Sequence, residues 1–207
     1  MANIPFTIVD ECYIHGGVSL HEGRLLANYA ADVTSGVIVE VGSNVGGSTS
    51  YLAMGVTRAK KFTPIYAVDC WDLQELVGRR PEHQKTAVYE RFLAQMRMLE
   101  AIGYVHPNLV VPIKGYSIST ASTWDKPIGL LHVDALHTYA ACKADLIAWA
   151  PHVISNGIIV VHDYFDPRFG CKKAADEFAK DNGYQVIKTL VSEWSPIRRG
   201  QIVLRKP

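Results

Sequence analysis

Short β-branched runs alternate with helical patterns along most of the chain, and this alternation constrains the fold more than any other feature. The runs are apolar on both faces and bounded by Gly, Pro, Asp or Asn, as expected for buried strands of a parallel sheet. They are Val37–Gly42, Ile65–Asp69, Leu109–Lys114, Ile128–Asp134 and Gly157–His162. The pattern therefore predicts an α/β fold, in which ligands bind at the carboxyl ends of the strands.

Helices are expected between these strands. One helix carries a single apolar stripe at helical spacing, and its cysteine fits there as a small buried hydrophobe. This stripe consists of Tyr139, Cys142, Leu146, Trp149 and Val153. A second helix is expected to open at Pro81, because proline suits the first helical position. Its apolar side consists of Val88, Phe92, Leu99 and Ile102. Further helices are expected near Leu20–Val33 and Lys172–Asn182.

Two more strand-like runs, Tyr184–Val191 and Gly200–Arg205, close the chain without a helix between them. The short segment between them allows a loop but not a parallel crossover, so the runs should pair antiparallel. The expected architecture is a Rossmann-like, mostly parallel seven-stranded sheet with one antiparallel strand near the C-terminus and helices on both faces. The 207 residues fit one domain, with an N-terminal helical cap over residues 1–35 and the core over residues 36–207.

Charge and cysteine content argue against several classes of protein. The formal net charge is +1, without the basic field of a nucleic-acid binder. No apolar run is long enough to cross a membrane, and no signal peptide is evident. The cysteines are far apart and form no C-x-x-C pair, which favours reduced thiols, a cytoplasmic location and no structural zinc. They are Cys12, Cys70, Cys142 and Cys171. We therefore expect no nucleic-acid and no membrane partner.

A glycine-rich loop follows the first predicted strand, over Glu40–Thr49. Glycines permit a tight turn, and the helix start behind them supplies unpaired N–H donors. A phosphate-binding P-loop would need Lys where Ser48 stands, and a dinucleotide fingerprint would need Gly where Asn44 stands. The second strand ends in Asp69, where an acidic side chain can accept hydrogen bonds from ribose hydroxyls. These features favour a nucleoside cofactor other than ATP or NAD.

The motifs resemble those of class I S-adenosylmethionine (SAM) dependent methyltransferases. Glu40-Val-Gly-Ser-x-x-Gly46-x-Ser48 and Ala67-Val-Asp69-Cys-Trp71 are similar to the SAM-binding motifs of that superfamily. A later stretch is similar to the small-molecule O-methyltransferases of the macrolide-sugar and cephamycin type. It comprises Leu131-His-Val-Asp134-Ala-Leu-His137-Thr-Tyr139, Asp145, Trp149, Asn156-Gly157 and His162-Asp163-Tyr164.

The resemblance implies SAM as the cofactor and assigns residues to its parts. The glycine loop would hold the methionine part, through Gly42, Ser43, Gly46 and Ser48. Glu40 would order that loop, and Asp69 would hold the ribose. Trp71 and Ser117 fall where the family lines the adenine pocket. The family's usual acidic residue beside Ser117 is replaced here by Tyr116.

A cluster of Asp and His residues is expected at the ends of the fourth and fifth strands: Asp134, His137, His162 and Asp163. Carboxylates suit Mg²⁺ or Mn²⁺, and the imidazoles leave Fe²⁺ or Zn²⁺ open. Neighbours in a regular strand point to opposite faces, which argues against a shared site for His162 and Asp163. The resemblance implies metal binding by Asp134 and Asp163, with His162 as a candidate third ligand.

The expected reaction is methyl transfer from SAM to a hydroxyl of a small molecule, with a sugar or glycosylated metabolite as the leading acceptor. His137 is the candidate general base and Asp134 the second catalytic residue, because a metal-bound alcohol needs a nearby proton acceptor. Catechol-type relatives carry Lys at the position of His137, so histidine favours the sugar-methylating branch.

Three segments are expected to shape the acceptor pocket: Asp72–Pro81, Phe165–Gly170 and Trp194-Ser195-Pro196. The alternative functions are an NAD(P)-dependent oxidoreductase on the same fold, a metal hydrolase or oxygenase that uses the Asp/His cluster without SAM, and an inactive SAM-binding partner protein. A homo-oligomer is left open.

Overall fold

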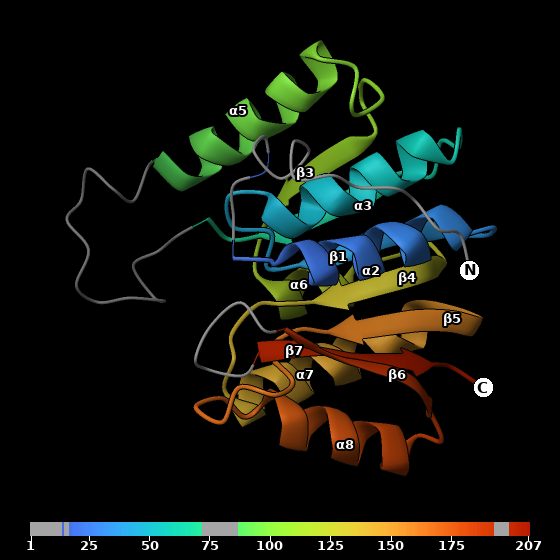
Figure 1. Ribbon diagram of the computed structural model, residues 1–207. Coiled ribbons are helices and arrows are strands. Elements are labelled where there is room, and N and C mark those ends of the chain that lie inside the picture. Colours follow the sequence, from blue (N-terminus) through green and yellow to red (C-terminus); the bar gives the residue numbers. More distant parts are fainter. Residues whose placement is uncertain (1–13, 15–16, 72–86, 193–198) are drawn as a thin grey trace.

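The computed structural model (Figure 1) describes residue 14 and residues 17–71, 87–192 and 199–207. Its centre is a seven-stranded sheet in the order β3-β2-β1-β4-β5-β7-β6. The strands are β1 (Val37–Val41), β2 (Ile65–Asp69), β3 (Val110–Lys114), β4 (Ile128–Val133), β5 (Val153–Val161), β6 (Gln185–Ser192) and β7 (Arg199–Arg205). Only β7 runs against its neighbours β5 and β6. The predicted mostly parallel sheet with one reversed strand is confirmed.

Helices cover both faces of the sheet (Figure 1). They are α2 (Leu20–Asp32), α3 (Gly47–Arg58), α5 (Ala87–Ala101), α6 (Ser117–Ser122), α7 (Tyr139–Trp149) and α8 (Cys171–Asp181), with a 3₁₀ turn η2 (Ala150–His152). One apolar cluster joins α2, α3 and α5 to strand residues such as Ile38 and Leu130. The other cluster joins α7 and α8 to the next residue of each of these strands, Val39 and Leu131. Successive strand residues thus enter opposite cores, which explains the apolar runs.

The start of α2 is fixed by a capping box. The hydroxyl oxygen of Ser19 accepts a hydrogen bond from the backbone N–H of Glu22, and the Glu22 carboxylate accepts one from the backbone N–H of Ser19. These bonds satisfy two backbone donors that a helix start leaves unpaired. They also fix the place of Glu22, whose side chain is buried.

Most expected element bounds lie within one residue of the structure, but three expectations about particular residues differ. The helix with the apolar stripe ends at Trp149, and Val153 begins β5 instead, paired with Ile128. Strand β5 is predicted to begin at Gly157 but begins at Val153. Asn156 has a left-handed backbone with φ of 62°, and the register with β4 shifts there. A periodic pattern does not detect such an irregular strand. Ile102 lies beyond the end of α5 and is 43% exposed, so it does not belong to the apolar side of that helix. The expected opening of α5 at Pro81 lies outside the described residues.

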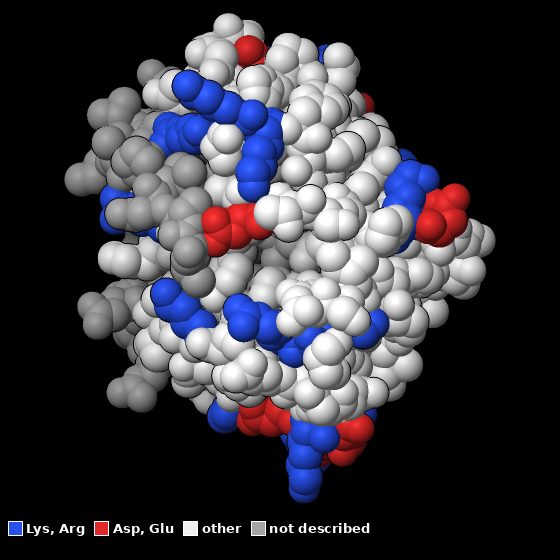
Figure 2. Space-filling view, turned by 90° about the vertical axis from the view of Figure 1, so that its right-hand side faces the viewer, with Lys and Arg blue, Asp and Glu red and all other residues white. Residues whose placement is uncertain are grey.

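Charged side chains are mixed on the face of the molecule in Figure 2. Lys and Arg stand there in several separate groups, with Asp and Glu among them and wide uncharged areas between. In the described part of the chain, no helix combines the length and apolar character needed to cross a membrane. Within the described residues, Cys70, Cys142 and Cys171 form no disulfide, and Cys142 is buried as its place in the apolar stripe predicts.

Candidate active site

A cavity of about 770 Å³ lies at the carboxyl ends of β1, β2, β4 and β5. Its wall includes the loop between β1 and α3, the residues that follow β2, β4 and β5, the start of α6 and parts of α5 and α7. This is the edge of the sheet at which an α/β fold binds its ligands. The volume is in the usual range for small-molecule sites.

The glycine loop lies directly against the chain that follows β4. Gly42 has φ of 93°, and a Cβ atom there would stand 2.2 Å from the carbonyl oxygen of Asp134. Gly46 has φ of 92° and precedes the first residue of α3. The loop therefore depends on glycine both for its backbone conformation and for the close approach to Asp134. The side chain of Ser43 is buried in the cavity wall, and its hydroxyl has no hydrogen-bond partner among the described residues.

The buried side chain of Glu40 supports the glycine loop. Its fully buried carboxylate contacts Nδ1 of His132 on the neighbouring strand at 3.1 Å, and it accepts a hydrogen bond from the Thr49 hydroxyl. Burial alone would raise the pKa of Glu40, but His132, Ser48 and Thr49 lower it below its ordinary value. Gly42, Ser43 and Ser48 line the cavity, whereas Glu40 and Gly46 are absent from its described lining. Glu40 therefore acts on the loop from within the protein core.

Asp69 ties the glycine loop to the end of β2. Its two carboxylate oxygens accept hydrogen bonds from the backbone N–H groups of Asn44 (2.8 Å) and Trp71 (2.7 Å). The indole N–H of Trp71 in turn donates to the carbonyl oxygen of Asn44 at 2.7 Å. Burial raises the pKa of Asp69, although both backbone donors oppose the shift. Asp69 and Trp71 line the cavity, and Trp71 also packs on Tyr89 and Phe92 of α5.

Ser117 lines the cavity at the start of α6, close to the end of β2. The backbone N–H of Gly115 donates to the carbonyl oxygen of Asp69 at 3.0 Å, which holds the two chain segments together. The Ser117 hydroxyl donates a hydrogen bond of 2.5 Å to Asp145 of α7 and accepts one of 3.0 Å from the Trp149 indole. Tyr116, which stands in the place of the family's acidic residue, also lines the cavity.

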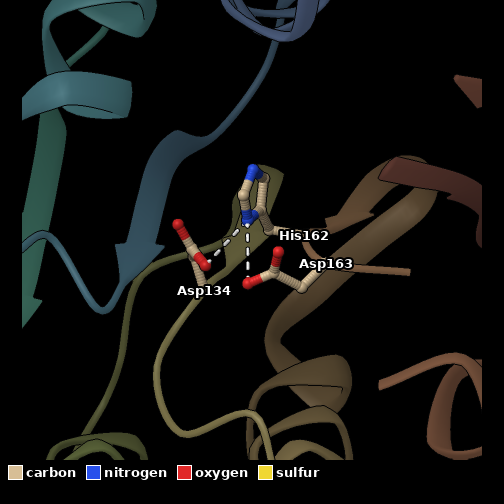
Figure 3. A group of neighbouring side chains, drawn as sticks. All are labelled: Asp134, His162 and Asp163. Carbon is tan, nitrogen blue, oxygen red and sulfur yellow. Dashed lines mark ion pairs between the residues drawn. The ribbon is translucent and has the colours of Figure 1, made fainter. Parts of the chain in front are cut away.

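Asp134, His162 and Asp163 converge at the cavity wall (Figure 3). Nδ1 of His162 lies 3.1 Å from Oδ1 of Asp134 and 3.4 Å from Oδ2 of Asp163. The argument that strand alternation separates His162 from Asp163 does not apply here. Strand β5 ends at Val161, and Asp163 adopts φ of 52°, so the regular alternation stops before these residues.

A residue that the sequence did not indicate completes this cluster. Oε1 of Glu22 in α2 lies 3.2 Å from Nε2 of His162, and both side chains are buried. Burial alone would lower the pKa of His162, but the carboxylates of Asp134, Asp163 and Glu22 raise it well above its ordinary value. Burial alone would raise the pKa of Glu22, but His162 and Ser19 lower it. The imidazole therefore lies between acidic groups on both sides.

His137 stands at the cavity wall, beside the same cluster. Its Nδ1 lies 3.4 Å from Oδ2 of Asp163, and its ring packs on Phe169 with 4.6 Å between centroids. Burial alone would lower the pKa of His137, but Cys171 and the carboxylates of Asp134 and Asp163 raise it. Phe169 belongs to the expected acceptor-pocket segment Phe165–Gly170 and lines the cavity. The other two segments, Asp72–Pro81 and Trp194–Pro196, lie outside the described residues.

The Asp134–His162–Asp163 group fits a divalent cation. One ligand atom from each residue lies within 4.8 Å of the other two. Both ring nitrogens of His162 and Oδ1 of Asp163 are buried without a hydrogen bond among the described residues, although carboxylates lie close to each nitrogen. Two carboxylates with one imidazole are a donor set that Mg²⁺, Mn²⁺ or Fe²⁺ accepts.

A family model described as a methyltransferase domain matches residues 39–164. The matched range runs from the strand before the glycine loop to the residue after Asp163. The chain belongs to this methyltransferase family. The prediction of a class I SAM-dependent methyltransferase is confirmed, and the family leaves the oxidoreductase and hydrolase alternatives without support.

Solved O-methyltransferases share the fold of this methyltransferase. NovP has a TM-score of 0.64 at 17% identity, over 93% of this chain and 82% of NovP. TomG from Streptomyces achromogenes, solved with SAM, has a TM-score of 0.66 at 16% identity, over 92% and 82%. CalS11, a TDP-rhamnose 3′-O-methyltransferase of calicheamicin biosynthesis, has a TM-score of 0.59 at 19% identity, over 90% and 77%.

A curated relative, the uncharacterized protein y4gI of Sinorhizobium fredii, is 29% identical to this methyltransferase over 126 residues. The match spans 61% of this chain and 13% of that protein.

The sequence assigns no role to Glu22, which contacts the acidic cluster, or to Asp145, which lines the cavity. The spacing Ser19-x-x-Glu22 signals a capping box, which explains the glutamate without any contact to the site. Asp145 stands among the motif residues, but its position on a helix stripe gives no sign of its hydrogen bond to Ser117.

Proposed function

We propose that the protein is a SAM-dependent O-methyltransferase that acts on a hydroxyl of a small molecule, with a sugar or glycosylated metabolite as the acceptor. One observation carries this proposal. The glycine loop and the Asp134–His162–Asp163 cluster line the same cavity and touch, because the Cα of Gly42 packs against the backbone of Asp134. A nucleoside held by the loop and by Asp69 would therefore present its reactive end beside the acidic cluster.

The cavity fits SAM by its chemistry as well as by its volume. The loop offers backbone donors and the unpartnered hydroxyl of Ser43, which suit the carboxylate and amine of the methionine part. Asp69 keeps acceptor capacity beyond its two backbone hydrogen bonds, because each carboxylate oxygen has two lone pairs. When bound, SAM supplies a sulfonium methyl group whose C–S bond breaks as the acceptor oxygen bonds to the methyl carbon, leaving neutral S-adenosylhomocysteine.

The residues of the acidic cluster orient the acceptor and receive its proton. Asp134, His162 and Asp163 would hold Mg²⁺ or Mn²⁺, which lowers the pKa of a coordinated hydroxyl. His137 lines the cavity beside Asp163 and is the side chain that we assign as general base. Its ring packs on Phe169, which also lines the cavity.

A sugar acceptor is supported by three points. Histidine stands at position 137, where catechol-type relatives carry lysine. Among solved structures with this fold, CalS11 is described as acting on TDP-rhamnose. The polar wall of Asp134, His137 and Asp163 offers partners for neighbouring hydroxyls of a ring.

Calorimetry and product analysis test the proposal together. SAM and S-adenosylhomocysteine should bind, while NAD and ATP should not. With SAM present, a panel of nucleotide sugars and glycosides should give S-adenosylhomocysteine in a reaction that EDTA stops, and catechol and structured RNA should not react. Asp134→Asn and Asp163→Asn should abolish turnover and preserve SAM affinity. Asp181→Asn, which changes an exposed aspartate of α8, should change neither.

Absence of SAM binding would overturn the proposed function at its root. Full turnover in EDTA would remove the metal and leave methyl transfer in place. Transfer to nitrogen, or to catechol at the rate of the best glycoside, would overturn the acceptor class alone.

A further inference from the structure

Asp145 is a buried carboxylate in the cavity wall that the proposed reaction does not use. It belongs to α7 and is 4% exposed, and its neighbours in the lining include Ala141 and Ala144. It lies on the side of the cavity formed by the start of α6, where its Oδ1 accepts the 2.5 Å hydrogen bond from the Ser117 hydroxyl. The side chain therefore meets any ligand that enters this end of the cavity.

The protein supplies this carboxylate with little compensation. Within residues 17–71, 87–192 and 199–207, Asp145 receives one side-chain hydrogen bond, from Ser117, and forms no ion pair. Burial raises its pKa to about 6. An acidic group kept in a binding cavity at this cost is a candidate for ligand recognition, because a ligand donor would replace the missing partner.

The position of Asp145 relative to Asp69 points to the part of the ligand that it contacts. The chain from Gly115 to Ser117 is hydrogen-bonded to the end of β2 at Asp69, and Ser117 leads directly to Asp145. A nucleoside whose ribose lies at Asp69 thus has its base near the start of α6. The Ser117 hydroxyl already donates to Asp145 and accepts from Trp149, so its hydrogen atom is not available to the base.

We propose that Asp145 accepts a hydrogen bond from the exocyclic amine of the adenine ring of SAM, and that Ser117 and Trp149 position its carboxylate for this contact. The inference rests on the proposed function. A carboxylate offers only acceptors, so it selects a base that carries an amine and rejects one that carries a carbonyl oxygen at the same place. The acidic group that is missing at Tyr116 is thereby supplied from a different helix.

Calorimetry with two ligands tests this inference. S-adenosylhomocysteine carries the amine, and S-inosylhomocysteine carries an oxygen there. The wild-type protein should bind the adenine compound at least about 10-fold more tightly, the lower end for a hydrogen bond to a charged group. Asp145→Asn should weaken the adenine compound about 10- to 100-fold and bring the two affinities together or reverse them, because the amide can donate to the oxygen. A purely structural role would not reverse the preference.

Two further variants keep the outcomes separate. Ser117→Ala should weaken both ligands and preserve the preference for the amine, because the carboxylate remains. Asp181→Asn should leave both affinities unchanged. Equal affinity of the wild-type protein for both ligands would overturn the inference without any variant, as would unchanged discrimination in Asp145→Asn. A wild-type protein that binds neither ligand would overturn the proposed function itself.

Discussion

Oε1 of Glu22 lies 3.2 Å from Nε2 of His162, although α2 and the end of β5 are far apart in the sequence. The opposite ring nitrogen of His162 faces Asp134 and Asp163 (Figure 3). A carboxylate on one ring nitrogen holds a proton there and leaves the other nitrogen to bind a cation. Helix α2 thus contributes to the cluster through Glu22, which is also part of the capping box of that helix.

Removal of the Glu22 carboxylate should weaken metal binding. Glu22→Leu keeps most of the side-chain volume but leaves Nε2 of His162 without an acceptor, so the affinity for Mn²⁺ should fall about 10- to 100-fold. Glu22→Gln keeps a hydrogen-bond acceptor and should therefore lose less Mn²⁺ affinity than Glu22→Leu. Titration calorimetry with Mn²⁺ in the absence of SAM measures both. Ser19→Ala removes the cap hydroxyl and its hydrogen bond to Glu22 but keeps the glutamate and its backbone hydrogen bond, so it should cost about 1 kcal/mol of stability and less metal affinity than Glu22→Leu. Equal Mn²⁺ affinity in Glu22→Leu would remove this role.

The close approach of Gly42 to Asp134 predicts a strong effect of a single methyl group. Gly42→Ala combines a left-handed backbone with a Cβ atom 2.2 Å from a carbonyl oxygen, so the loop must move away from the end of β4. Stability should fall by more than about 3 kcal/mol, and SAM binding should be lost. Gly103→Ala is the matched control, because φ there is 77° and no atom lies within 4 Å. It should cost about 1 kcal/mol and preserve SAM affinity. If urea unfolding gave similar losses of unfolding free energy for Gly42→Ala and Gly103→Ala, the steric argument would be contradicted.

The sequence predicts the sheet well because buried parallel strands have a strong local pattern. Ile65–Asp69 was placed with the bounds that the structure has, since a regular strand ends where its apolar run ends. The start of β5 was missed because the left-handed residue Asn156 interrupts the pattern without ending the strand. Periodicity detects regular elements and not the irregular residues between them.

The candidate site was predicted where chemistry follows a strand end and missed where it comes from a distant helix. Asp69 ends a strand, Asp134 and Asp163 lie just beyond strand ends, and all three line the cavity. The contact of Glu22 with His162 and that of Ser117 with Asp145 depend on how helices pack, which no local pattern encodes. The argument against a shared site for His162 and Asp163 fails because it applies strand alternation beyond Val161, where β5 ends.

The buried pair of Glu40 and His132 predicts a loss of stability when the glutamate is replaced. Glu40→Leu leaves His132 and Thr49 without their buried partner, so unfolding in urea should show a loss of about 3–5 kcal/mol. The double variant Glu40→Leu/His132→Leu should recover part of this loss, because two apolar side chains pack without an unpaired charge. A double variant no more stable than the single one would show that the glutamate and the histidine do not act as a pair.

The uncompensated carboxylate of Asp145 predicts a specific pH dependence of stability. Burial raises its pKa from 3.8 to about 6, so the folded protein binds this proton more tightly than the unfolded chain does. The contribution to stability is therefore full below pH 4 and is lost as the pH rises to about 6, by roughly 2–3 kcal/mol. Asp145→Asn does not titrate, so its unfolding free energy relative to wild type should increase by that amount between pH 4 and pH 7. Asp181→Asn should show no such trend. Urea unfolding at a series of pH values, without ligand, measures the difference, and parallel curves for wild type and Asp145→Asn would contradict it. S-adenosylhomocysteine should narrow the gap at pH 7, because it binds the folded wild-type protein more tightly than the variant.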